Sequence, residues 1–139
     1  MALQVLYEVD LVSHSAPSVL HEHFANASDL NASVQEYCTE LVLGVVGCQD
    51  LLDHYIQVHA PEWPLEQVAL VDRNLLRMAL YEFTFGGIPT KVAINEAVEL
   101  AKIFGADSAP RFVNGVLGAL VPKREEILQS LEEIQDSSK

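Results

Sequence analysis

Apolar residues recur at helical spacing in every long segment of this chain, and prolines and glycines separate the segments. In residues 110–121 the apolar side chains fall at i, i+1, i+4, i+5, i+8 and i+9, which is the period of a helix buried on one side. We find no convincing strand. The pattern predicts an all-α protein of about seven helices, packed as a single domain over residues 1–139.

Residues that commonly begin or end helices mark the boundaries of these segments. Ser33 and Glu36 have the spacing of a capping box, which predicts a long helix that begins after Ser33 and ends before Pro61 and Pro64. The other boundaries have serine or proline at helix starts and glycine at helix ends. These residues are Ser15, Pro17, Gly86, Gly87, Pro89, Gly105, Ser108, Pro110 and Pro122.

Charge is distributed unevenly along the chain. Residues 1–72 contain eleven Asp and Glu but no Lys or Arg, and all eight Lys and Arg lie in residues 73–139. The net charge of −12 argues against broad nucleic-acid binding, which requires cations that neutralise phosphates. An acidic half suits either a basic protein partner or solubility alone.

The usual catalytic and metal-binding motifs are missing from the sequence, so we expect no enzyme activity, cofactor or metal. His21 and His23 point to different sides of a helix, whereas zinc-binding helices place their ligands four residues apart. Cys38 and Cys48, if on one helix, are about 15 Å apart, which is too far for a disulfide. Free cysteines without a secretory signal predict a cytoplasmic protein.

The stretch RFVNGVLGAL contains Asn-Gly, a strong hairpin signal, inside a helical pattern. Each glycine in a helix costs about 1 kcal/mol relative to alanine. Arg111, Asn114, Gly115 and Gly118 share the arc that the apolar residues leave free. Two interpretations are open: the glycines let another helix approach closely, or they expose backbone to a ligand beside the donors of Arg111 and Asn114. The adjacent phenylalanine could then stack on a base.

Glu96 lies on an apolar arc of the helix predicted over residues 91–104, between Val92 and Ile103. A carboxylate in such a position must be paired or exposed at the edge of the helix, because burying an unpaired charge is costly. We expect Glu96 to be mostly buried and to form a structural ion pair with Arg77 of the preceding helix.

Three segments resemble the NusB transcription antitermination family: LLRMALYEF at 75–83, IPTKVAINEAVELAKIFG at 88–105 and RFVNGVLGAL at 111–120. The most specific feature is KVAINEAVELAK followed by FVNGVL at this spacing. ALQVLYEVD at 2–10 is similar to the end of that family's first helix, whereas residues 13–60 match in helical pattern only.

The resemblance implies an all-helical fold and a non-enzymatic adaptor. Members of this family bind box A RNA together with the small-subunit ribosomal protein NusE, and the complex helps RNA polymerase read through terminators in ribosomal RNA operons. Asp72 is the implied contact for the ribosomal protein. We expect Lys91, Lys102 and Arg111 to form one small basic patch. The candidate RNA contacts are Tyr7, Lys91, Lys102, Arg111, Phe112 and Asn114.

The family normally begins with an arginine-rich arm directly before the ALQ-LY stretch, where this sequence has Met1. We therefore expect the domain to lack that arm, to bind the ribosomal protein well and to bind RNA poorly when alone. Two alternatives stay open: the RNA-binding domain of a ribosomal-RNA cytosine methyltransferase, and an acidic protein adaptor without RNA binding. A homodimer also stays open.

Overall fold

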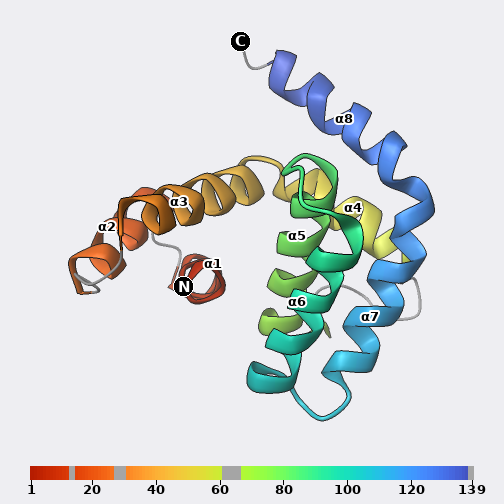
Figure 1. Cartoon of the computed structure of the whole chain (residues 1–139), viewed down its shortest axis with the longest axis horizontal. Coiled ribbons are helices and arrows are strands. Elements are labelled where there is room, and N and C mark those ends of the chain that lie inside the picture. Colours follow the sequence, from red (N-terminus) through yellow and green to blue (C-terminus); the bar gives the residue numbers. More distant parts are fainter. Residues whose placement is uncertain (13–14, 27–30, 61–66, 138–139) are drawn as a thin grey trace.

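The computed structural model describes residues 1–12, 15–26, 31–60 and 67–137 (Figure 1). Within these ranges all regular elements are helical, which confirms the predicted all-α fold class. The elements are, in chain order, α1 (Ala2–Val12), α2 (Ala16–Asn26), α3 (Ala32–Gly47), α4 (Gln49–His59), α5 (Leu70–Thr84), α6 (Thr90–Phe104), α7 (Ala109–Leu120), the short 3-10 helix η2 (Val121–Lys123) and α8 (Arg124–Ser137).

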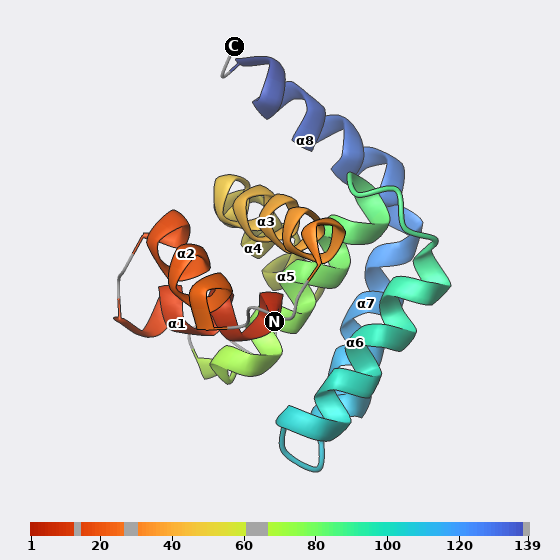
Figure 2. The ribbon, with the colours of Figure 1, turned by 60° about the vertical axis from the view of Figure 1, so that its left-hand side comes forward.

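Helix α5 lies at the centre of the fold, between α1–α4 and the pair formed by α6 and α7 (Figure 2). Residues 74–84 of α5 are buried without exception. A helix that is buried all round serves as the common support of its neighbours. Side chains at the two ends of α5 therefore have fixed positions relative to both groups of helices.

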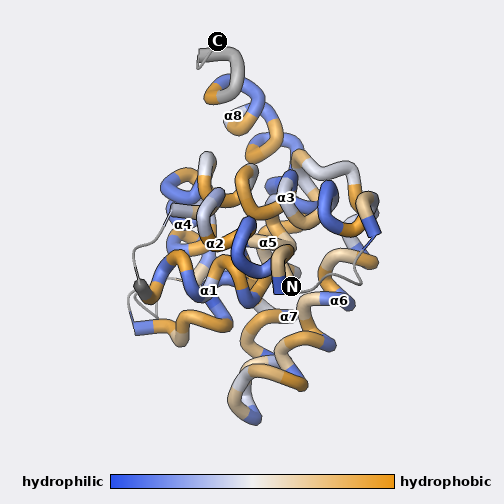
Figure 3. The backbone as a smooth tube through the Cα atoms, turned by 90° about the vertical axis from the view of Figure 1, so that its left-hand side faces the viewer, coloured by the Kyte–Doolittle hydropathy of each residue, from blue (hydrophilic) through white to orange (hydrophobic). Residues whose placement is uncertain are grey.

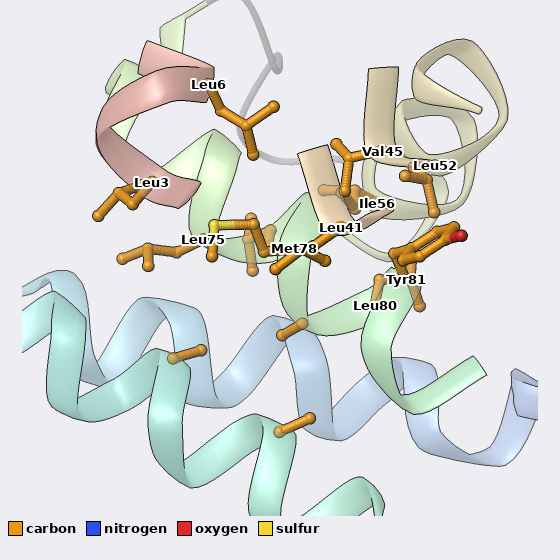
Figure 4. Packing of buried hydrophobic residues seen from close by; sticks show 14 of the residues in the cluster. Leu3, Leu6, Leu41, Val45, Leu52, Ile56, Leu75, Met78, Leu80 and Tyr81 are labelled. Atoms are coloured by element: carbon orange, nitrogen blue, oxygen red, sulfur yellow. The ribbon is translucent and has the colours of Figure 1, made fainter. Parts of the chain in front are cut away.

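The hydrophobic core continues from α5 to the other helices. Leu3 and Leu6 of α1 pack above Leu75 and Met78 of α5 (Figure 4). Helix α8 extends away from the body toward the C-terminus (Figure 1). Apolar and polar positions alternate along α8 (Figure 3), and among its apolar side chains Ile127 and Leu131 are buried. Helix α8 is thus anchored through one face.

The long helix predicted after Ser33 is in fact two helices. Helix α3 ends at Gly47, and Cys48, with φ −117° and ψ 13°, turns the chain into α4. The break cannot be recognised from the apolar pattern of the sequence, because Val45 before it and Leu52 after it are both buried. The capping prediction is also wrong, since the side chain of Asn31 accepts the hydrogen bond from the Val34 amide at 2.9 Å. Residues 61–66, which include the expected stop signals, lie outside the described ranges.

Arg77 joins α5 to the N-terminal half through a buried ion-pair network. Its side chain is 3% exposed, and its Nε and Nη2 donate to the two carboxylate oxygens of Asp53 at 2.6 and 2.9 Å. Its Nη1 donates to Asp10 at 2.8 Å. Asp10 also accepts a hydrogen bond from the Asn74 side chain at 3.2 Å. One guanidinium thereby connects α1, α4 and α5.

The predicted ion pair between Arg77 and Glu96 is wrong, because Glu96 is exposed and forms no ion pair among the described residues. Glu96 is exposed because α6 buries a different face from the one expected. Its buried stripe consists of three alanines, Ala93, Ala97 and Ala101, rather than of the larger apolar residues. The arc that carries Glu96 therefore lies beside the packed face and not within it.

Glu82 of α5 carries a buried carboxylate, with 7% of the residue exposed. It accepts a hydrogen bond from the Tyr37 hydroxyl, but among the described residues it forms no ion pair. Burial raises the pKa of Glu82 above its ordinary value. The hydrogen bond from Tyr37 lowers that pKa in part, and the nearby charge of Glu96 raises it further. Because the folded pKa lies above the unfolded one, ionised Glu82 costs stability, and the cost disappears as pH falls through that pKa.

We expect Glu82→Gln to raise the Tm at neutral pH, with a gain that shrinks as the pH is lowered. The glutamine side chain would keep an oxygen for the Tyr37 hydroxyl while removing the buried charge. Thermal unfolding at a series of pH values measures this, with Glu99→Gln as the exposed control on α6. A gain that is the same at every pH would contradict the assignment of the effect to ionisation.

Candidate RNA and protein-binding surface

A hollow of about 300 Å³ lies where the beginning of α5 meets the beginning of α7. We call it the Asp72 hollow. It contains Asp72, the implied contact for the ribosomal protein, together with Arg111 and Phe112, two of the implied RNA contacts. Its lining residues are Val68, Ala69, Asp72, Ser108, Arg111 and Phe112. The fold thus joins residues that the sequence analysis had assigned to two different ligands.

Gly105 lets α5, α6 and α7 converge at this hollow. A Cβ atom on Gly105 would lie 2.5 Å from the Cβ of Ala109 and 2.9 Å from the carbonyl oxygen of Ala101. It would also lie 3.3 Å from Oδ1 of Asp72. The Gly105 amide donates to the Ala101 carbonyl at 2.9 Å, which ends α6 as the sequence predicted.

Asp72 carries an unsatisfied carboxylate oxygen at this junction. Its Oδ1 is buried and has no hydrogen-bond partner among the described residues. Burial raises the pKa of Asp72. A buried acceptor without a donor is costly, so this end of α5 is a locally unfavourable place for an unpaired carboxylate. The position of Asp72 in the first turn of α5 fits a carboxylate, because the helix dipole favours negative charge there.

The polar arc of α7 is open to solvent. A Cβ atom added to Gly115 or Gly118 would meet nothing within 4 Å among the described residues, so the interpretation that these glycines admit another of the described helices is wrong. Arg111 and Asn114 are exposed on the same arc, whereas Phe112 is half-buried against the core. The arc therefore presents a cation, an amide and bare backbone beside one aromatic side chain.

The expected single basic patch does not form, because Lys91 is remote from the other two cations. Lys91 lies in the first turn of α6 and Lys102 in the last turn, about 16 Å apart along the helix axis. Helices α6 and α7 run side by side, so the end of α6 that carries Lys102 lies near the start of α7 and Arg111 (Figure 1). Lys102 also donates to Glu99 at 2.9 Å.

Tyr7 is 37% exposed on α1 and does not line the Asp72 hollow. Its helix contacts α5, the helix that carries Asp72. Val68 and Ala69 line the hollow although no sequence motif indicates them, and Ser108, predicted as a helix start, lines it too. These residues lie in short segments directly before α5 and α7. Such segments beside rigid helices commonly carry binding residues, so this position was the signal that could have indicated them.

The described parts of the chain offer no other evident chemical centre. Within them, no three His, Cys, Asp or Glu side chains are grouped so that they could hold a metal ion. His23 instead contacts Glu8, with 2.9 Å between Nε2 and Oε2. Both cysteines are free and buried, and burial raises the pKa of each thiol. None of the described helices has the length and apolar character needed to cross a membrane.

Comparisons with known proteins identify the family of this chain. The NusB family model matches residues 1–122. The transcription antitermination protein NusB of Dehalococcoides mccartyi is 46% identical over 121 residues, which are 86% of this chain and 84% of that protein.

Solved structures of the same family share the fold. A structure of T. maritima NusB has a TM-score of 0.82 at 26% identity and covers 92% of both chains. A complex of the antitermination factors NusB and NusE with double-stranded RNA has a TM-score of 0.76 at 26% identity, covering 93% of this chain and 91% of that one. The chain therefore belongs to the NusB family of transcription antitermination proteins.

Proposed function

We propose that this antitermination protein is a non-catalytic adaptor that binds box A RNA together with the ribosomal protein NusE. The proposal places it in the cytoplasm, as part of the RNA polymerase complex that reads through terminators. The Asp72 hollow is the observation that carries the proposal, because it combines an unsatisfied acceptor with a cation and an aromatic side chain. A relative of the same fold is known in complex with NusE and double-stranded RNA.

The ribosomal protein is the ligand that Asp72 suits. Ribosomal proteins that contact RNA are basic, and an Arg or Lys at the hollow would pair with the carboxylate of Asp72, which lines it. The net charge of −12 favours such a partner at long range, because complementary charge accelerates encounter. Asp72 thus supplies the specific contact and the acidic surface supplies the attraction.

RNA is the ligand that the open arc of α7 suits. Arg111 can contact a phosphate, the Asn114 amide can bond to a base edge, and Phe112 offers a ring for stacking. Lys102, near the start of α7, is a second cation for RNA, but it is already paired with Glu99. So few phosphate contacts make RNA binding by this chain weak and sensitive to salt. A bound ribosomal protein would add cations to a composite surface.

We expect box A RNA to bind the mixture of this chain and the ribosomal protein much more tightly than either protein alone. Arg111→Ala should weaken RNA binding by the mixture and reduce the slope of log affinity against log salt by about one unit, since one phosphate contact is lost. Titrations of labelled RNA at several salt concentrations measure both quantities.

Lys123→Ala is the matched control. It removes the same charge from an exposed residue beyond the far end of α7, about 18 Å along the helix from its start. Its affinity and salt slope should equal those of the unaltered chain. Tight RNA binding by the chain alone at physiological salt would contradict the need for a partner. An Arg111→Ala variant with unchanged affinity and a lower Tm would show that Arg111 has a structural role.

A further inference from the structure

Lys102 and Glu99 form an exposed ion pair in the last turns of α6, next to the surface proposed to bind RNA. The Nζ of Lys102 donates to Oε1 of Glu99 at 2.9 Å, and the two side chains are 56% and 67% exposed. Residues three apart on a helix are neighbours on its surface, so α6 itself keeps the two side chains together. The chain passes from the end of α6 through Gly105 into α7, so the pair lies near Arg111 (Figure 1).

The packing of the fold does not depend on the Glu99 side chain. The residues that α6 buries are Ala93, Ala97 and Ala101, and Glu99 lies on the exposed side of the same helix. Ion pairs between exposed side chains contribute little to stability, because water screens the charges and the side chains lose rotamer freedom. An effect of Glu99 on ligand binding can therefore be measured without a large change in Tm.

The carboxylate of Glu99 opposes both ways in which Lys102 can contact a phosphate. If the Lys102 ammonium leaves Glu99 for the phosphate, the energy of the ion pair is lost. If the ammonium stays and uses another of its three donors, the carboxylate lies close to the phosphate and repels it. Either way, the affinity for RNA is lower than it would be without the carboxylate.

A basic protein would respond to Glu99 in the opposite direction. A cationic side chain of a bound protein near the end of α6 is attracted by the Glu99 carboxylate, and its binding weakens when that charge is removed. The sign of the change in affinity therefore shows whether a phosphate or a protein cation lies beside Glu99.

We propose that Glu99 limits the affinity of this surface for RNA by holding Lys102, and that it thereby acts as a specificity-determining residue. The inference rests on the proposed function, because it assigns Lys102 to RNA. Phosphate contacts carry no sequence information, so a residue that weakens one of them makes binding depend more on contacts to the bases. Glu99 acts through Lys102 and is thus a positioning residue.

The test is a titration of labelled box A RNA with the complex of this chain and NusE, at a NusE concentration that saturates the chain. Glu99→Gln should raise the RNA affinity at least about threefold at low salt. It should also steepen the slope of log affinity against log salt by up to about one unit, because Lys102 becomes available to one phosphate. Combining it with Lys102→Met should cancel most of both effects.

Glu125→Gln is the matched control for Glu99→Gln. It removes the same charge from another exposed ion pair, which Glu125 forms with Arg124 in the first turn of α8, beyond the far end of α7 from Arg111. Its RNA affinity and salt slope should equal those of the unaltered chain.

The inference is overturned if Glu99→Gln changes the RNA affinity no more than Glu125→Gln does, if it weakens RNA binding, or if its full gain persists beside Lys102→Met. A complex of the unaltered proteins that binds box A RNA no better than NusE alone would instead overturn the proposed function, and this inference with it.

Discussion

Arg77→Met should lower the free energy of unfolding by about 3–5 kcal/mol, because it leaves two carboxylates at the centre of the fold without their cation. Asp53 and Asp10 receive three short hydrogen bonds from the guanidinium, and methionine replaces none of them. The loss should appear in urea unfolding as a lower midpoint with an unchanged slope, since the surface exposed on unfolding stays the same.

Lys102→Met is the matched control for Arg77→Met. It also removes a cation from an ion pair, but the pair with Glu99 is exposed and contributes little. Asp53→Asn and Asp10→Asn should each cost less than Arg77→Met, because the guanidinium keeps one carboxylate in either variant. A loss below about 1 kcal/mol for Arg77→Met would mean that the network is not a major source of stability.

Gly105→Ala should destabilise the fold by about 1–3 kcal/mol and also weaken binding of the ribosomal protein. The added methyl group meets the Cβ of Ala109 and the carbonyl of Ala101, which belong to short side chains or backbone and cannot move aside easily. Helices α6 and α7 must separate to admit it. The same shift displaces the surroundings of Asp72, whose Oδ1 is also within reach of the new atom.

Gly118→Ala gives the opposite expectation and serves as the control. Gly118 lies within α7, and none of the described residues would come within 4 Å of a Cβ added there, so alanine should stabilise the helix by up to about 1 kcal/mol. Chemical unfolding gives the stabilities, and titration with the ribosomal protein gives the affinities. If Gly105→Ala is as stable as the unaltered chain, the convergence of the three helices tolerates more volume than the contacts indicate.

The sequence predicted the fold well wherever apolar periodicity and glycine or proline boundaries agree. The boundaries at Gly105 and at residues 86–87 are examples. It failed at Cys48, because an apolar stripe can continue across a break between two helices that pack on the same neighbour. Periodicity reports which face is buried, and it does not report whether the backbone hydrogen bonds continue.

The candidate site was only partly predictable. The motif indicated Arg111, Phe112 and Asp72 separately, and tertiary structure was needed to show that they line one hollow. The partner assigned to Arg77 was wrong because large apolar residues of α6 were assumed to face the core. The small stripe of Ala93, Ala97 and Ala101 packs there instead, since small side chains let neighbouring helices come close.

The shared lining of the Asp72 hollow couples its two ligands thermodynamically. Under the proposed function, Asp72 contacts the ribosomal protein while Arg111 and Phe112, on the same hollow, contact RNA. Any factor by which the protein raises the affinity for RNA must equal the factor by which RNA raises the affinity for the protein. A tenfold effect corresponds to a coupling free energy of about 1.4 kcal/mol. The adaptor then behaves as a coincidence detector, which assembles fully only where both ligands are present.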